Sequence, residues 1–290
     1  MDKTSVTKTV IPAAGFGTRM LPAAKAIPKE MLPVLDRPTI QYVVEEAAGA
    51  GATDVLLVVS RDKKAVEDHF DKHPELEARL SAANKTALIE SILKLQATVR
   101  VHTTRQMEQR GLGHAVLQAK QHVGDEAFLC CLGDTIFSGS DITPSQQLIQ
   151  AYAKYKTTII GVEEVPLEKV ERYGIVGGDM IDDEIIRINT LVEKPKQSEA
   201  PSRLAIAARY VLTPDIFACI EATAPGKGNE IQLTDAIKIQ LKNGPIHGVV
   251  LKSKRHDIGN PIDWLKTNLI YAKRDAQTWA QIEPLLRSLL

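Results

Sequence analysis

The sequence has little cysteine, no long apolar run and no excess of charge of either sign. Three cysteines in 290 residues are too few and too unevenly spaced for a disulfide framework or a zinc cluster. The seven histidines show no H-E-x-x-H or similar ligand spacing, which also argues against zinc. No stretch approaches the ~20 apolar residues of a membrane-spanning helix, and the N-terminus lacks the apolar core of a signal peptide. We therefore expect a cytoplasmic protein without a membrane partner.

Net charge is absent as well, because 36 basic residues balance 36 acidic ones. Without a global positive field, the chain is not expected to bind nucleic acid or an anionic membrane surface. This balance still allows a local basic site for a small anion. Hydrophobic residues make up 44% and charged residues 25%, as in ordinary globular proteins.

Apolar strand patterns alternate with helical patterns in the first half of the chain. The strands are expected at 9–12, 54–60, 98–102 and 127–132, and the helices at 39–49, 62–70, 74–95 and from about 113. Such alternation predicts a doubly wound, mostly parallel sheet covered by helices on both faces, an α/β fold in three α/β/α layers. Cys130 and Cys131 lie in the last of these apolar runs and are expected to pack in the core.

The second half is richer in strands, which makes the predicted sheet a mixed one. Strands are expected at 157–163, 174–177, 185–193, 205–212 and 248–251, and helices at 214–221, 231–241, 261–273 and 276–290. No long Pro/Gly/Ser linker divides the chain, so one elaborated domain is favoured over two independent ones.

A glycine loop follows the first strand, in the run A-A-G-F-G-T-R-M-L-P. Gly15 and Gly17 would let backbone N–H groups approach phosphate oxygens that a side chain would keep away. A dinucleotide fingerprint would need a third glycine where Met20 stands, and a P-loop would need Lys-Ser/Thr where Thr18 and Arg19 stand. The loop therefore belongs to neither of these two classes.

Three cations lie in or near this loop: Arg19, Lys25 and Lys29. On a chain of zero net charge, their position predicts a site for a phosphate-bearing anion. The competing interpretation is a surface turn with scattered bases.

The stretch G-F-G-T-R-M-L-P-A-A-K-A-I-P-K-E-M-L-P, residues 15–33, strongly resembles the signature of bacterial UTP–glucose-1-phosphate uridylyltransferases. These enzymes are members of the wider sugar-1-phosphate nucleotidyltransferases. Further matching segments follow in order along the chain: P-T-I-Q-Y-V-V-E-E-A (38–47), R-Q-M-E-Q-R-G-L-G-H-A-V (105–116), L-G-D (132–134), Y-G-I-V (173–176), V-E-K-P-K (192–196), A-R-Y-V-L (208–212), N-E-I-Q-L-T-D-A-I (229–237) and D-I-G-N (257–260).

The resemblance implies a mixed α/β/α sheet of the nucleotide-diphospho-sugar transferase type. It implies transfer of a uridylyl group from UTP to glucose 1-phosphate by Mg²⁺-assisted in-line attack, which gives UDP-glucose and pyrophosphate. Residues 1–262 would form the catalytic domain. Residues 263–290 would form a helical extension packed on it, where a subunit interface could also lie.

The resemblance also implies roles for individual residues. Residues expected to bind the nucleotide are Ala13, Ala14, Gly15, Gly17, Thr18, Gln106, Gly111 and Asp134. Residues expected to act in catalysis are Arg19 and Lys29, which would stabilise the departing pyrophosphate, and Lys194, which would hold the attacking phosphate. Residues expected at the sugar phosphate are Gly174, Glu193 and Lys194, and those expected to bind Mg²⁺ are Asp134 and Asp257. Glu230 and Asp235 could approach the sugar.

Each of these residues has a plainer structural interpretation. Lys29 could be an exposed lysine near a turn, and Asp134 and Asp257 could close a strand and cap a helix. Glu193 and Lys194 could form a surface ion pair. Gln106 could be a polar residue of the core, and Gly174 could be a glycine that starts a strand.

The sequence also departs from the uridylyltransferase pattern. Ala24 stands where threonine is usual, Ala208 where glycine is usual, and Pro261 where lysine often follows D-x-G-N. Two hypotheses therefore stay open beside uridylyl transfer: the same reaction with another base or sugar, thymidylyl transfer being the nearest case, or a non-catalytic regulatory paralogue.

The C-terminal residues carry an apolar stripe at helical spacing: Trp279, Ile282, Leu285, Leu286 and Leu289. The stripe fits either packing within the chain or a subunit contact, and we expect a homo-oligomer, a dimer or a tetramer.

Overall fold

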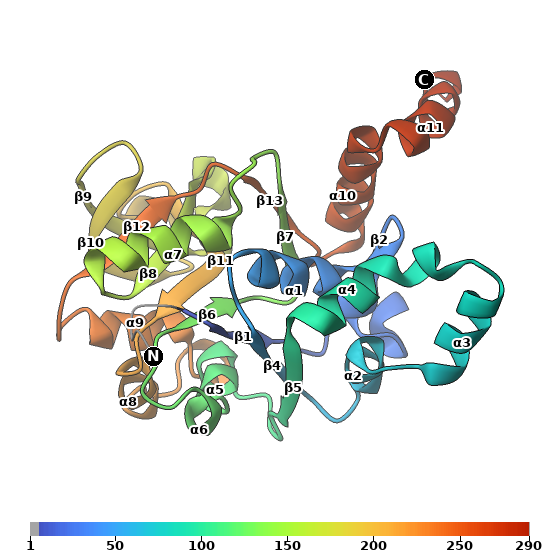
Figure 1. Cartoon of the computed structure of the whole chain (residues 1–290). Helices are drawn as coiled ribbons and strands as arrows, with labels where there is room; N and C mark the ends of the chain where they lie inside the picture. The colour runs from blue at the N-terminus through green and yellow to red at the C-terminus, as the bar shows by residue number, and fades with distance from the viewer. Residues whose placement is uncertain (1–5, 290) are drawn as a thin grey trace.

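The computed structural model describes residues 6–289, in which a twisted nine-stranded sheet forms the centre of the molecule (Figure 1). Its strand order is β5-β4-β1-β6-β11-β8-β12-β10-β9. The strands are β1 (Lys8–Pro12), β4 (Asp54–Val59), β5 (Arg100–Arg105), β6 (Phe128–Cys131), β8 (Ile159–Glu164), β9 (Gly174–Met180), β10 (Ile185–Glu193), β11 (Leu204–Leu212) and β12 (Ile246–Val250).

Parallel pairing holds the first half of the sheet together. β1 pairs in parallel with β4 and β6, and β4 pairs in parallel with β5. β1, β4 and β6 are apolar and buried on both faces, as crossover helices require. The carboxyl ends of β1 and β6 therefore meet at one edge of the sheet, where ligands of open α/β sheets collect.

Antiparallel pairing dominates the second half. β11 runs antiparallel to β6, β8 and β9, and β10 runs antiparallel to β9 and β12, while β8 and β12 are parallel. The mixed α/β sheet predicted from the sequence is confirmed, and its parallel character is concentrated in the first half.

Helices cover both faces of the sheet, which gives the three predicted layers. One core cluster joins the sheet to α1 (Thr39–Gly49), α2 (Lys64–Phe70), α4 (Glu90–Thr98) and α7 (Pro144–Tyr155). A second joins the opposite face to α5 (Leu112–Leu117), α6 (Lys120–Val123), α8 (Ile216–Glu221) and α9 (Leu233–Gln240). Cys131 belongs to the first cluster and Cys130 to the second, because side chains alternate along a strand.

Several elements differ from the sequence-based expectation. The helix expected over 74–95 is broken into α3 (Pro74–Ala82), a 3₁₀ turn and α4, so the following strand begins at Arg100 rather than at residue 98. Helix α7 was not predicted, although Thr143 and Gln146 form a capping box at its start. Within the described part of the chain there are also seven 3₁₀ turns: Thr18–Met20, Ala23–Lys25, Lys29–Met31, Thr86–Ile89, Leu167–Arg172, Gln197–Glu199 and Lys227–Asn229.

Two small ribbons lie beside the main sheet. One pairs β2 (Pro33–Val34) with β3 (Arg37–Pro38), and the other pairs β7 (Thr135–Ser138) with β13 (Lys254–Asp257). Sequence patterning did not identify either ribbon, since the strands are only two or four residues long. The β7–β13 ribbon brings Asp257 opposite Thr135, the residue that follows Asp134.

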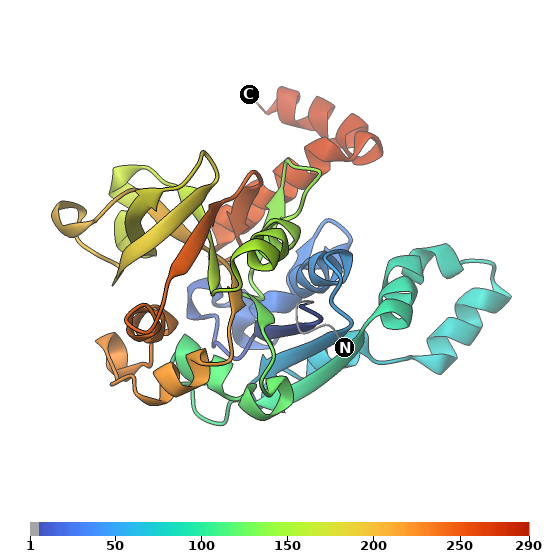
Figure 2. The same ribbon diagram turned by 60° about the vertical axis from the view of Figure 1, so that its left-hand side comes forward.

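The chain ends in α10 (Pro261–Arg274) and α11 (Ala276–Ser288). Figures 1 and 2 show α11 at the outer end of α10, away from the sheet. The predicted domain boundary at 262/263 falls inside α10, so the division into a catalytic domain and an extension stays a prediction. Among residues 6–289, no helix has the length and apolarity needed to cross a membrane.

Candidate active site

All fourteen residues to which the resemblance gives a binding, catalytic or metal-binding role line one cavity of about 920 Å³. The cavity lies where the carboxyl ends of β1 and β6 face the strands of the second half. Its lining includes Ala13, Ala14, Gly15, Gly17, Thr18, Arg19, Lys29, Gln106, Gly111, Asp134, Gly174, Glu193, Lys194 and Asp257. Lys25, the third cation near the glycine loop, is exposed and is not part of the lining.

The glycine loop connects β1 to a 3₁₀ turn that contains Thr18 and Arg19. Gly17 has φ 66, a left-handed conformation that favours glycine, and a Cβ there would lie 3.3 Å from the Cβ of Lys29. A Cβ on Gly15 would meet nothing within 4 Å, so this residue borders open space. Gln109 supports the loop by donating a hydrogen bond of 3.3 Å to the carbonyl oxygen of Ala14.

Lys29 and Asp134 form a direct ion pair beside this loop, and both side chains are largely buried. Burial opposes ionisation of Asp134, but the charges of Lys29 and Arg19 outweigh it and hold the pKa of the carboxyl below its usual value. Burial likewise opposes protonation of Lys29, but the charge of Asp134 outweighs it and raises the pKa of the ammonium group. Both groups are therefore charged at neutral pH. The burial of the Lys29 side chain and its pairing with Asp134 exclude the exposed-lysine interpretation.

A second ion pair anchors the segment that carries Lys29. Glu30 accepts a 2.7 Å hydrogen bond from Lys63, and both side chains are almost fully buried. Because a buried pair is satisfied only in a defined geometry, this contact limits the positions that Lys29 can occupy.

Asp257 reaches the cavity through the β7–β13 ribbon, in which it pairs with Thr135, the neighbour of Asp134. The N–H group of Ile258 also donates a 2.9 Å hydrogen bond to the carbonyl oxygen of Asp134. Burial and the negative charge of Asp134 raise the pKa of Asp257. The charge of Asp134 thus acts on Asp257, and the positive charges of Arg19, Arg255 and Lys29 only partly offset this effect.

Gly259, in the D-I-G-N motif, has a steric role. A Cβ there would lie 2.7 Å from an oxygen of Asp257 and 3.1 Å from Nη2 of Arg19. Only glycine leaves room for the guanidinium group and the carboxylate to lie this close to the backbone.

Gln106 and Gly111 lie together on another wall of the cavity. The side chain of Gln106 is buried, and its amide nitrogen donates a 3.1 Å hydrogen bond to the carbonyl oxygen of Gly111. The same nitrogen lies 3.0 Å from Nδ1 of His114. Gly111 has φ 97, and a Cβ there would lie 2.7 Å from the carbonyl oxygen of Ile231. Packing against the backbone of residue 231 is therefore sufficient to require glycine at position 111.

Glu193 is the last residue of β10 and pairs with Gly174 at the start of β9, and Lys194 follows directly. The two side chains form an ion pair of 2.9 Å, and Lys194 has a left-handed backbone with φ 46. Thr234 orients Glu193 by donating a 2.8 Å hydrogen bond to its second oxygen. A Cβ at Gly174 would lie 2.9 Å from Cδ1 of Ile206 and 3.1 Å from the Glu193 carboxylate, so the tight contact explains this glycine.

Sequence reasoning missed several lining residues, of which Arg255 is the most informative. Its guanidinium group lies 4.1 Å from the ring centre of Tyr173 and pairs with Glu163 at 2.5 Å. Its position two residues before Asp257 was the available signal. Glu230 lines the cavity as suggested, whereas Thr234 and not Asp235 contacts Glu193.

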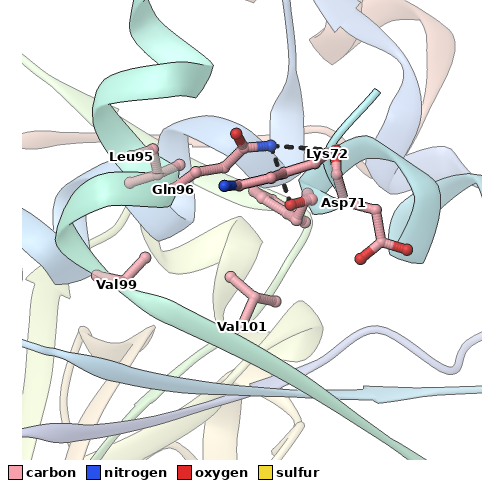
Figure 3. Close-up of a pocket in the computed structure, with 7 residues that line it drawn as sticks. Asp71, Lys72, Leu95, Gln96, Val99 and Val101 are labelled. Atoms are coloured by element: carbon pink, nitrogen blue, oxygen red, sulfur yellow. Dashed lines mark hydrogen bonds between the residues drawn. The ribbon is translucent and has the colours of Figure 1, made fainter. Parts of the chain in front are cut away.

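A second pocket, of about 200 Å³, lies between α2, α4 and β5 (Figure 3). Gln96 lines this pocket and donates hydrogen bonds of 3.2 and 3.1 Å to the carbonyl oxygens of Phe70 and Asp71. None of the predicted site residues lines it, and within residues 6–289 no group of three or more His, Cys, Asp or Glu side chains is arranged to hold a metal ion.

Known proteins resemble this chain over most of its length. Residues 8–274 match the family model described as nucleotidyl transferase. The chain is 45% identical over 284 residues to the UTP–glucose-1-phosphate uridylyltransferase 2 of Staphylococcus saprophyticus, with 98% of each chain covered.

Solved structures of UDP-glucose pyrophosphorylases are also similar to this chain. A UDP-glucose pyrophosphorylase complexed with UDP-glucose has a TM-score of 0.87 and 40% identity, covering 93% of this chain and 100% of that one. A UTP-bound UGPase from Acinetobacter baumannii has a TM-score of 0.91 and 36% identity, covering 99% and 100%. This chain therefore belongs to the nucleotidyl transferase family, and the resemblance to UTP–glucose-1-phosphate uridylyltransferases is confirmed.

Proposed function

We propose that this enzyme transfers the uridylyl group of UTP to glucose 1-phosphate and releases pyrophosphate. The observation that carries the proposal is the convergence of Arg19, Lys29 and Lys194 with two aspartates on one cavity. We call the part lined by residues 13–19, Lys29, Gln106 and Asp134 the nucleotide end. The part lined by Gly174, Glu193 and Lys194 is the sugar end.

The reaction needs charge neutralisation more than proton transfer. A phosphate oxygen of glucose 1-phosphate, anionic near neutral pH, attacks the α-phosphorus of UTP while the bond from that phosphorus to the bridging oxygen breaks. No general base is required, and the main obstacles are repulsion between two phosphates and the charge of departing pyrophosphate. Lys194 holds the attacking phosphate, and Arg19 and Lys29 stabilise the pyrophosphate.

Asp134 and Asp257 are the residues that would hold Mg²⁺. Two carboxylates suit this ion, which takes one or two protein oxygens and completes its shell with phosphates and water. The raised pKa of Asp257 beside Asp134 fits a position where a bound cation compensates a second negative charge. When bound, Mg²⁺ would neutralise phosphate charge and align the triphosphate.

Gln106 is the residue that would recognise the base. Because Gly111 and His114 engage its amide nitrogen, its carbonyl oxygen is the group available to accept from the imide N–H of uracil. Cytosine has no such N–H and is disfavoured, whereas thymine carries the same group. This contact therefore does not separate UTP from dTTP, and the similarity to uridylyltransferases favours UTP.

The test supplies each nucleoside triphosphate with glucose 1-phosphate and Mg²⁺ and follows pyrophosphate release. UTP should react fastest and CTP slowest among the pyrimidines. A clear preference for dTTP would assign the chain to thymidylyl transfer. Nucleotide-sugar binding without turnover would support the hypothesis of a regulatory paralogue.

We further propose a cytoplasmic homo-oligomer, a dimer or a tetramer. All three cysteines are free and buried, which suits a reducing compartment. Helix α11 contains no buried residue, and its Leu285 is exposed, so its apolar stripe is available to a second copy. Light scattering of the unmodified protein and of Leu285→Glu tests this proposal, with a smaller mass expected for the variant.

A further inference from the structure

Ala208 has a backbone conformation that alanine rarely adopts. It lies in β11 with φ 59, in the left-handed region where the Cβ of an L-residue comes too close to a neighbouring carbonyl oxygen. The pairing register with β8 shifts between Ile206 and Tyr210, so Ala208 occupies a β-bulge. Bulges often redirect side chains beside functional sites.

The surrounding structure holds this conformation from two sides. The carbonyl oxygen of Ala208 accepts hydrogen bonds of 3.1 Å from the N–H of Leu132 and from Nη1 of Arg209. The guanidinium group of Arg209 is fully buried. It donates hydrogen bonds of 2.8 and 3.0 Å to the carboxylate of Glu46 and one of 2.9 Å to the carbonyl oxygen of Thr135. Strain that persists under such constraint at a cavity wall suggests a role there.

Ala208 also occupies a junction in the cavity. Ile206, Ala208 and Tyr210 all line it. Ile206 packs against Gly174 at the sugar end. Leu132, which donates a backbone hydrogen bond to Ala208, lies two residues before Asp134. Ala208 is thus linked to residues of both ends of the cavity.

We propose that Ala208 determines which hexose 1-phosphates the cavity accepts, because this lining residue carries a methyl group between the sugar end and the Asp134 turn. The inference rests on the proposed function. Glucose 1-phosphate fits, whereas hexose 1-phosphates with a bulkier substituent or a differently oriented hydroxyl are excluded. One methyl group in a pocket can change discrimination by roughly tenfold or more.

The experiment compares Ala208→Gly with a matched control, Lys156→Gly. Lys156 is exposed, has φ 54 at the end of α7 and lies outside the cavity lining. Both variants relieve a left-handed backbone, so each should raise the midpoint of thermal unfolding by about 2 °C. kcat/KM is measured with UTP and four sugars: the 1-phosphates of glucose, galactose, mannose and N-acetylglucosamine.

Ala208→Gly should lower the preference for glucose 1-phosphate over at least one other sugar by about tenfold, while Lys156→Gly leaves every ratio unchanged. If Ala208→Gly is stabilised and active but all ratios stay within about twofold of the unmodified protein, the inference is overturned. Absence of turnover by the unmodified protein with every sugar would overturn the proposed function as well, so the two failures are distinguishable.

Discussion

The two ends of the cavity differ in how their charges are held. At the nucleotide end, the side chains of Lys29 and Asp134 are 15% and 17% exposed, and the buried Lys63–Glu30 pair lies behind them. At the sugar end, Lys194 is 44% exposed and its partner is its own neighbour, Glu193. Fixed charges in a water-poor site act more strongly than exposed ones. The nucleotide end should therefore govern the rate of the chemical step, and the sugar end should govern substrate binding.

The sharpest test of the nucleotide end is removal of divalent ions. Chelation should lower pyrophosphate release on the order of 1000-fold or more, since two phosphates would then meet with protein cations alone, and Mg²⁺ should restore it. Asp257→Asn should raise the Mg²⁺ concentration needed for half-maximal activity, while Asp36→Asn, at an exposed carboxylate, should not. Full activity after complete chelation would refute the metal assignment.

Lys29→Ala should have the next largest effect. Loss of this buried cation should reduce kcat by about 100- to 1000-fold, because it acts on charge that develops as pyrophosphate leaves. Steady-state kinetics would measure this effect, with Lys25→Ala as the control because Lys25 is an exposed lysine of the same segment. Equal effects of the two substitutions would show that Lys29 has no special role.

Lys194→Ala should act mainly on substrate binding. The KM for glucose 1-phosphate should rise roughly tenfold to hundredfold through loss of a charge-assisted contact, with UTP binding largely intact. Lys196→Ala removes a neighbouring lysine that is 79% exposed and should change neither constant. If Lys194→Ala weakened both substrates equally, the separation between the two ends of the cavity would not hold.

The smallest effect is expected at the glycine loop. Gly17→Ala forces a left-handed alanine against Lys29, which should cost about 1 kcal/mol of stability and raise the KM for UTP several-fold. Gly51→Ala also places an alanine at a positive φ, here 100, but its Cβ would have no atom within 4 Å. It should lose stability in denaturant titrations without any change in KM, and a matching change in KM would remove the phosphate-binding argument for Gly17.

The nucleotide end could be predicted from the sequence because most of its residues follow β1 in one continuous stretch. Strand β1, the glycine loop and the cations are local features, and the strand end that carries Asp134 is marked by an apolar run. The sugar end was predicted only through family resemblance. Gly174 and Glu193 come from β9 and β10, which meet through antiparallel pairing, and Thr234 reaches Glu193 from helix α9. The sequence signal for Arg255 was its position two residues before Asp257.

By itself, the sequence determined the alternation of strands and helices, the position of a glycine loop with cations beside it, and the resemblance to one family. The first two follow from local periodicity and residue spacing, and the third follows from motifs that match the family in the same order. Tertiary structure alone decided that Asp134 and Asp257 are neighbours, that Lys29 is buried and paired, and that Ala208 has a left-handed backbone. The reason is physical, because these features depend on strand register and long-range packing, which no local pattern of residues specifies.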